Sequence, residues 1–331
     1  FLDRDGTVFT RIWCSFEVYI ANVLRKQLQS ESTESVGSWT VYTATTEHVL
    51  WGETREAVGI IPGGAPGELS SSTSDRESHF PLDLILQSIR DTNVHRAQAS
   101  KETDRVHILN SIIQNDDLDA PPPDDHPEYQ KVNDAVRGAF AMSATAIRAA
   151  LENGRDDIWK MVMEARSKSG LDGRYKLNFE SFDPPLSSRQ AFDIVSHLPL
   201  TCNELYIYNA KGETAEGAVE GLINWLGRAE NAKWVTCDSC KVEDEAKRST
   251  LGSQMANVLK ERHSQSIEYL NIDYLIDSQN LSEWTAAIEK MTHLKKLFCD
   301  GSGLSEDEQE IVRQAASHVK TIYIDGGHLY R

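Results

Sequence analysis

The sequence has little positive charge, and it has no long apolar run. Lys and Arg together number 34 against 51 Asp and Glu, which gives a net charge of −17. A partner with a phosphate backbone or an anionic membrane surface needs a basic face, so this balance argues against both. No apolar run approaches the roughly 20 residues of a membrane helix. We therefore expect no nucleic-acid partner and no membrane contact.

Cysteine is also scarce. The chain has five cysteines, an odd number without regular spacing, which is more typical of the reducing cytoplasm than of a disulfide framework. Cys237 and Cys240 form a lone C-x-x-C pair, whereas Zn²⁺ needs four ligands and no second pair follows at a suitable spacing. The interpretation is two cysteines at a strand end, with no metal and no cofactor predicted.

What is present is an ordinary globular composition, with 40% hydrophobic and 26% charged residues in 331 residues. That length is enough for two domains. The chain begins with Phe1 rather than Met, at a point that resembles a strand, so we expect a fragment or a cleaved product.

The first half of the chain mixes strand and helix patterns. We expect an amphipathic helix over 10–29, a strand over 39–44 and a long loop over 59–79. Two helices are expected next, over 81–90 and 97–113. The sequence thus predicts an α/β unit over residues 1–115. An acidic, proline-rich linker and a helical connector follow it over 116–170.

From residue 171 a repeat of strand-like runs dominates the sequence. The runs recur every 25–35 residues or so, the range of strand-plus-helix units, at 175–179, 204–208, 233–237, 267–272, 294–299 and 319–324. Amphipathic helices are expected between them, starting near Ser187, Thr214 and Ser305. Such a unit cannot bury its own apolar face, so neighbouring units have to stack.

The runs at 267–272 and 294–299 carry an L-x-x-L-x-L rhythm, which resembles leucine-rich repeats of the ribonuclease-inhibitor-like kind. The resemblance implies an irregular β-α solenoid over 171–331, and an ordinary doubly wound α/β domain is the alternative. It also implies a concave strand face that binds a protein partner. The residues expected there are Tyr206, Tyr208, Trp234, Thr236, Tyr269, Asn271, Phe298 and Tyr323, with Tyr206, Tyr208, Trp234, Tyr269 and Tyr323 as the binding candidates. Because side chains alternate along a strand, half of this set is expected to face the core.

The start of the chain carries a possible catalytic motif. The run from Asp3 to Thr7, DRDGT, resembles the first motif of haloacid-dehalogenase-like phosphatases. The resemblance implies that Asp3 is the nucleophile, that Asp5 is the general acid/base, and that Mg²⁺ screens the charge. The alternative is a strand followed by a turn, in which Asp and Gly are favoured.

A second signal overlaps the first. The run from Arg11 to Glu17, RIWCSFE, resembles the W-C-x-x-E helix start of TIR domains. In TIR domains that cleave NAD, this glutamate faces the ribose, so the resemblance implies that role for Glu17. It also implies that residues 1–115 are part of a TIR-like or flavodoxin-like α/β unit. The alternative is that Trp13 and Phe16 belong to the core.

The order of these segments is also similar to uncharacterised protist and algal proteins that join a TIR-like segment to leucine-rich-like repeats. Together the patterns predict an α/β, non-catalytic interaction and signalling module that uses its repeat surface to bind a protein. Two enzymes remain as alternatives: an NAD hydrolase that uses Glu17, and a phosphatase that uses Asp3 and Asp5.

Overall fold

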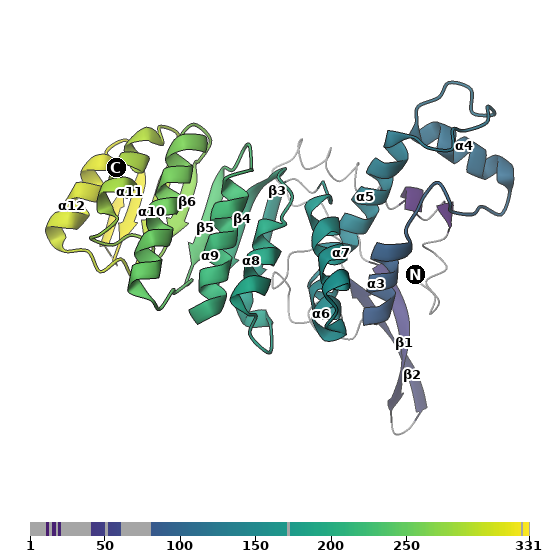
Figure 1. Cartoon of the computed structure of the whole chain (residues 1–331), viewed down its shortest axis with the longest axis horizontal. Helices are drawn as coiled ribbons and strands as arrows, with labels where there is room; N and C mark the ends of the chain where they lie inside the picture. Colours follow the sequence, from purple (N-terminus) through teal and green to yellow (C-terminus); the bar gives the residue numbers. More distant parts are fainter. Residues whose placement is uncertain are drawn as a thin grey trace. The chain divides into compact units, whose positions relative to one another are not determined.

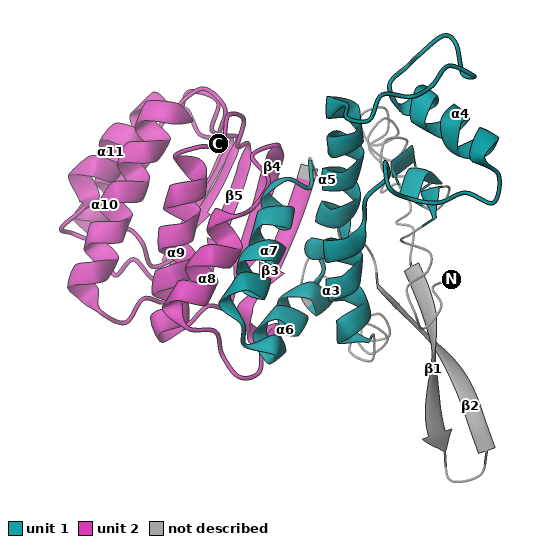
Figure 2. Ribbon diagram, turned by 45° about the vertical axis from the view of Figure 1, so that its right-hand side comes forward, with its two compact units in different colours: residues 1–171 teal, residues 172–331 magenta. Residues whose placement is uncertain are grey.

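The protein is described by a computed structural model covering residues 11–12, 15–17, 19–20, 41–49, 52–60, 81–170, 173–325 and 327–330, with the backbone alone at 41–49, 52–60, 144, 173 and 327–330. The chain divides into two compact units (Figures 1 and 2). Unit 1 spans residues 1–171 and unit 2 spans residues 172–331, so the boundary falls beside the predicted start of the repeats. The predicted connector, 116–170, lies within unit 1.

The strands described in unit 1 form a hairpin. β1 (Val41–Val49) pairs antiparallel with β2 (Gly52–Ile60). β1 extends beyond the strand expected over 39–44, and β2 was not expected. The first half of β2 is charged, through Glu53, Arg55 and Glu56, and this obscured its strand pattern.

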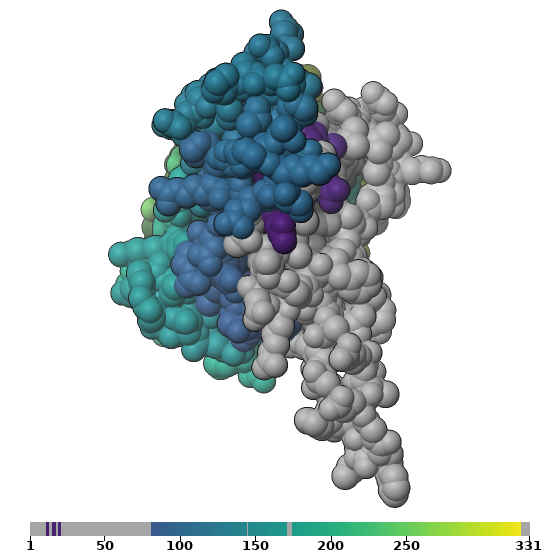
Figure 3. All heavy atoms as spheres, turned by 90° about the vertical axis from the view of Figure 1, so that its right-hand side faces the viewer, coloured from purple at the N-terminus to yellow at the C-terminus, as the bar shows by residue number. Residues whose placement is uncertain are grey.

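The helices of unit 1 are α3 (Leu82–Asp91), α4 (Glu102–Ile112), α5 (Pro127–Ala141), α6 (Ala144–Asn153) and α7 (Asp156–Ser167). α3, α5, α6 and α7 pack on one another, and Ile85, Phe140 and Ile147 are buried among them. The blue spheres in Figure 3 show α3, α4 and the loop after α4 at the surface of this unit.

The expected helix over 97–113 begins later than predicted. Its first residue is Glu102, because the backbone around Gln98 is extended and pairs with the N-terminal segment. The Ile12 N–H donates to the Gln98 carbonyl at 3.0 Å, and this bond is incompatible with a helix at that point.

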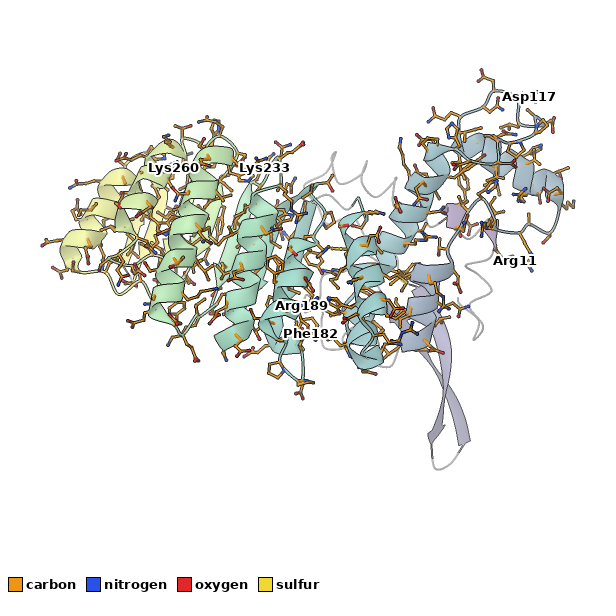
Figure 4. The ribbon with its side chains drawn as sticks, in the orientation of Figure 1. Arg11, Asp117, Phe182, Arg189, Lys233 and Lys260 are labelled. Atoms are coloured by element: carbon orange, nitrogen blue, oxygen red, sulfur yellow. The ribbon has the colours of Figure 1, made fainter. Side chains whose placement is uncertain are left out.

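Hydrogen bonds hold the acidic segment after α4 at two points. The Asn110 side chain donates to the carbonyls of Leu118 and Ala120, at 2.9 and 2.7 Å. His126 caps α5, because its Nδ1 accepts a hydrogen bond from the Glu128 N–H at 3.2 Å. Between these points the loop projects outward, as the position of Asp117 in Figure 4 shows.

Unit 2 is a sheet covered by helices. Its strands are β3 (Gly173–Asn178), β4 (Cys202–Tyr208), β5 (Trp234–Asp238), β6 (Tyr269–Ile272), β7 (Lys296–Cys299), β8 (Thr321–Ile324) and β9 (Gly327–Tyr330). They lie side by side in chain order. β3 to β8 are parallel, and β9 returns antiparallel to β8. The fold of this unit is therefore α/β, with each of the six predicted runs contributing a strand.

The connections between the parallel strands carry helices: α8 (Ser188–Ser196), α9 (Gly212–Leu226), α10 (Glu245–Arg262), α11 (Leu281–Lys290) and α12 (Glu306–Ala315), with a short 3₁₀ helix, η2, at Phe179–Ser181. α8 to α12 lie on one side of the sheet in Figures 1 and 2, each packed against the next. Among the described residues of unit 2, the helices α8 to α12 therefore cover one face of the parallel strands and leave the other uncovered.

The helix starts test the capping predictions. Ser187 and Ser305 are confirmed as N-caps, and each forms a capping box with the residue three positions on. The prediction for Thr214 was wrong, because α9 already begins at Gly212. Thr214 is buried inside the helix, and its hydroxyl donates to the Leu186 carbonyl. No helix in the described ranges combines the length and the apolar character that a bilayer crossing requires.

Candidate functional site

The two faces of the unit 2 sheet have different side chains. On β4 to β8 the buried residues of the helix-covered face are aliphatic or thiol-bearing and at most 1% exposed: Leu205, Ile207, Val235, Cys237, Leu270, Ile272, Leu297, Cys299, Ile322 and Ile324. On β3 this face carries Tyr175 and Leu177, which pair with Leu205 and Ile207. The opposite face, here called the open face, carries the residues between these along each strand. The candidate site lies on the open face, because its aromatic and charged side chains are only partly covered.

Six rings on the open face form a continuous stack, here called the aromatic ladder: Tyr206, Tyr208, Trp234, Tyr269, Phe298 and Tyr323. The Trp234 and Tyr269 centroids are 5.0 Å apart with planes 9° from parallel, and Tyr269 and Phe298 are 5.3 Å apart. Phe298 and Tyr323 follow at 5.9 Å. The expectation that half of the aromatic set faces the core is wrong, because all six rings share one strand parity.

Strand register explains the ladder. Trp234 is paired with Tyr269, and Phe298 with Tyr323, so their side chains leave the sheet side by side. Adjacent strands lie about 4.8 Å apart, which sets the observed spacing between rings. Stacked pairs of this kind contribute about 0.5–1.5 kcal/mol beyond their buried area. The ladder therefore stabilises the fold as well as shaping the surface.

Short polar side chains interrupt the aromatic row at its centre. Thr236 and Asn271 are paired in register, with Tyr206 beside Thr236 and Phe298 beside Asn271. They are 3% and 8% exposed. Among the described residues neither Thr236 Oγ1 nor Asn271 Oδ1 has a hydrogen-bond partner. A buried polar atom without a partner costs about 1–3 kcal/mol, so two adjacent ones are unusual in a folded core.

Carboxylates follow the strands on the same face, in what is here called the aspartate row: Asp238, Asp273, Asp300 and Asp325. Asp238 lies two residues beyond Thr236, and Asp273 two residues beyond Asn271, so each keeps the parity of the open face. After the row the chain turns through left-handed backbone at Ser239, Tyr274 and Gly301, with φ of 54°, 65° and 67°. The repeated turn places one aspartate at the carboxyl end of each strand from β5 to β8.

Asp273 has the most perturbed environment in the row. Its side chain is 8% exposed, and its Oδ1 accepts the Asp300 N–H at 3.0 Å. Burial, and then the neighbouring charges of Asp238 and Asp300, raise the pKa of Asp273 to about 7. Near neutral pH the Asp273 carboxyl is therefore protonated in part of the population.

The other members of the row have different partners. Asp325 accepts hydrogen bonds from the Ser302 N–H at 2.9 Å and from the Ser302 hydroxyl at 2.6 Å, so both of its oxygens are engaged. Asp238 accepts one hydrogen bond from the Ser239 hydroxyl, at 2.8 Å. The carboxyls of Asp238 and Asp273 thus stand next to the unpartnered oxygens of Thr236 and Asn271. We call these four residues the polar centre.

Positive charge is found at other margins of the face. The Arg174 guanidinium lies 5.3 Å from the Tyr206 ring centroid and bonds Glu204 at 2.9 Å, at the β3 margin. Lys233, just before β5, lies at the amino end of the strands, on the side where Figure 4 also places Lys260. Lys176 and Lys296 also lie on the open face, paired in register with Tyr206 and Tyr269. The aspartate row therefore lies at the carboxyl ends of β5 to β8, and the cations of the open-face strands lie within the strands.

The remaining predicted site residues belong to other parts of the chain. Asp3 and Asp5 lie outside the described residues, and so does Trp13. Glu17 is described, and its side chain is exposed. The residues Cys237 and Cys240 are buried, and the interaction of the Cys237 thiol with Cys240, together with burial, raises the pKa of Cys237. Within the described ranges no three His, Cys, Asp or Glu side chains are grouped to hold a metal ion.

Unit 1 contains a cavity of about 420 Å³ between α3, α6 and α7. Its charged lining residues are Asp83, Arg90, Glu152 and Arg155. Arg90 and Arg155 are already paired with Asp91 and Asp157, at 2.9 and 2.6 Å. The lining thus combines charges of both signs and defines no ligand class.

The aromatic residues of the site were predicted from the sequence, and the aspartate row was not. The signal for the row was an aspartate after each of four strand-like runs, but aspartate is common in turns, so this pattern alone does not indicate a site. No family model, no curated protein and no solved structure matches this chain.

Proposed function

We propose that the chain is a non-catalytic interaction module that binds a protein partner on the open face of unit 2, with unit 1 acting in assembly or signalling. The observation that carries the proposal is the aromatic ladder, whose rings, apart from the nearly buried Tyr206, remain partly exposed. Tyr and Trp are enriched at the centres of protein interfaces, because they bury large areas at low entropic cost. Tyr206, Tyr208, Trp234, Tyr269 and Tyr323 are the proposed contact residues.

The proposal includes the architecture of unit 2. Strands in chain order, helices on one side and a repeated left-handed turn support a β-α solenoid of the leucine-rich-repeat kind. Such stacks present a strand face along their whole length, which suits an extended partner. The TIR-like interpretation of residues 1–115 remains a prediction, as do NAD cleavage by Glu17 and phosphoryl transfer through Asp3 and Asp5.

A peptide selection tests the function. A random peptide library displayed on phage is selected against the immobilised full chain, and the selected peptides are titrated against variants by fluorescence anisotropy. We expect the double variant Trp234→Ala/Tyr269→Ala to weaken binding at least ten-fold, since interface hot spots of this type contribute 2 kcal/mol or more.

The matched control removes apolar surface from outside the open face. Leu200 and Ile311 are 42% and 47% exposed, so Leu200→Ala/Ile311→Ala should leave peptide affinity unchanged. Circular dichroism verifies that each variant is folded, and Tyr208→Ala replaces the double variant if that protein is unfolded. Peptides that bind both double variants equally well, or a selection without any binder, would overturn the proposal.

A further inference from the structure

The unpartnered oxygens and the carboxyls of the polar centre are hydrogen-bond acceptors. Asn271 Oδ1 and the carboxylates of Asp238 and Asp273 accept, the Thr236 hydroxyl can accept or donate, and the Asn271 amide N–H groups are the other donors of the centre. The neighbouring charges that raise the pKa of Asp273 are the carboxylates of Asp238 and Asp300, so negative charge accumulates at this point. A ligand that completes this site therefore brings N–H donors and positive charge.

The surrounding rings favour the same chemistry. Trp234 and Tyr269 precede Thr236 and Asn271 by two residues, so the polar centre adjoins the most parallel pair of the ladder. The faces of Trp and Tyr attract cations, and a planar guanidinium also stacks on them. Arg174 beside Tyr206 shows one such contact within this protein, at 5.3 Å.

We propose that the polar centre binds the guanidinium of an arginine on the protein partner, stacked on Trp234 and Tyr269 and donating to Asp238, Asp273 and Asn271. This inference rests on the proposed function, since it names the partner residue at the same face. Arginine is favoured over lysine because its five donors lie in one plane and match several acceptors at once. The chain's net charge of −17 also favours a basic partner.

Binding of the arginine also releases a proton. With its pKa raised to about 7, the Asp273 carboxyl carries a proton in part of the population at neutral pH, and the arriving cation favours its carboxylate form. The proton leaves to solvent, so no bond other than O–H is broken. Affinity for an arginine peptide should therefore increase from pH 6 to pH 8.

The test uses peptides from the selection described above, each made a second time with citrulline for arginine. Citrulline keeps the shape of arginine but has no charge. We expect selected peptides to contain arginine, and the change to citrulline to weaken binding to the full chain about ten-fold or more. The double variant Asp238→Asn/Asp273→Asn should bind arginine peptides more weakly, to a similar degree. In this variant, replacing arginine by citrulline should change the affinity less than it does in the native chain.

Glu289→Gln is the control, because it removes one exposed carboxylate on α11 and should leave both affinities unchanged. Isothermal titration in buffers of different ionisation enthalpy measures the proton released. Peptides that depend on Trp234 and Tyr269 but tolerate citrulline would overturn this inference and leave the proposed function intact. If the Trp234→Ala/Tyr269→Ala variant binds the peptides with unchanged affinity, both this inference and the proposed function are overturned.

Discussion

The helix-covered face and the open face of unit 2 are made by the same strands, one residue apart. On β4 to β8 the buried residues of the helix-covered face are Leu, Ile, Val and Cys, which pack under the helices of unit 2. The open face carries rings, two unpartnered polar groups and a row of carboxylates. The helix-covered face is buried and apolar, as protein cores are. The open face retains unpartnered polar atoms and carboxylates, which protein cores usually exclude. The difference shows which half of each strand serves stability and which half is free to serve binding.

The largest expected effect is on the helix-covered face. Leu270 has no exposed surface, so Leu270→Ala leaves a cavity under the helices. We expect the free energy of unfolding to decrease by about 2–5 kcal/mol, measured by urea denaturation. Peptide affinity of the fraction that remains folded should not change. A loss below about 1 kcal/mol would mean that this face is not the main core of unit 2.

The second effect concerns the pH dependence of stability. The pKa of Asp273 is about 7 in the fold and 3.8 as its ordinary value. The folded chain therefore binds a proton more tightly than the unfolded chain does. This contribution to stability is complete below pH 3.8 and is lost as pH rises through 7.

Asp273→Asn removes that loss and keeps an acceptor for the Asp300 N–H. The stability of the variant relative to the native chain should therefore increase between pH 5 and pH 8, by no more than about 1.4 kcal/mol per pH unit. Urea denaturation at both pH values measures it, with Glu289→Gln as the control. A difference that is the same at both pH values would refute the environment assigned to Asp273.

A smaller effect is expected from the unpartnered hydroxyl. Thr236→Val keeps the shape of the side chain and removes a buried oxygen without a partner. We expect stability to increase by about 1 kcal/mol and affinity for arginine peptides to decrease. Thr214→Val is the contrast, because its hydroxyl bonds the Leu186 carbonyl and its loss should destabilise the fold. If Thr236→Val also destabilises the fold, the polar centre is satisfied internally.

The smallest effect is expected at the β3 margin. Arg174 is exposed, and it both bonds Glu204 and lies over Tyr206. Exposed pairs and cation–π contacts contribute about 0.5–1 kcal/mol, so Arg174→Ala should change stability by no more than that. Thermal denaturation measures the change. A large loss would show that this margin, and not the helix-covered face, supports the sheet.

The sequence predicted the strands of unit 2 because their β-rich runs recur at a repeat spacing and contain few breakers. It also placed Ser187 and Ser305 at helix starts, where capping is a local property. It was wrong at Thr214 and over 97–101, where contacts from distant segments decide. Strand register is likewise a tertiary property, so the sequence did not show that Trp234 and Phe298 share a face.

The sequence predicted only part of the candidate site, because the proximity of side chains on different strands depends on strand register. Aromatic residues in strand-like runs stand out in a sequence, and five of the six ladder residues were named as binding candidates. Asp238 and Asp273 are 35 positions apart, and their proximity follows only when β5 and β6 are paired in register. An aspartate before a turn looks the same whether it is solvated or next to a second carboxyl. Burial, which perturbs Asp273, is not visible in the sequence.

The most direct test of the central claim compares tryptophans on the two faces. Trp225 and Trp284 are fully buried in α9 and α11, and Trp234 is on the open face. The full chain, with its seven tryptophans, is labelled with 5-fluorotryptophan, and the ¹⁹F resonances of Trp225, Trp234 and Trp284 are assigned with Trp→Phe variants. Adding a selected arginine peptide should shift the Trp234 resonance and leave those of Trp225 and Trp284 in place. A bound peptide that leaves Trp234 unshifted would contradict the assignment of binding to the open face.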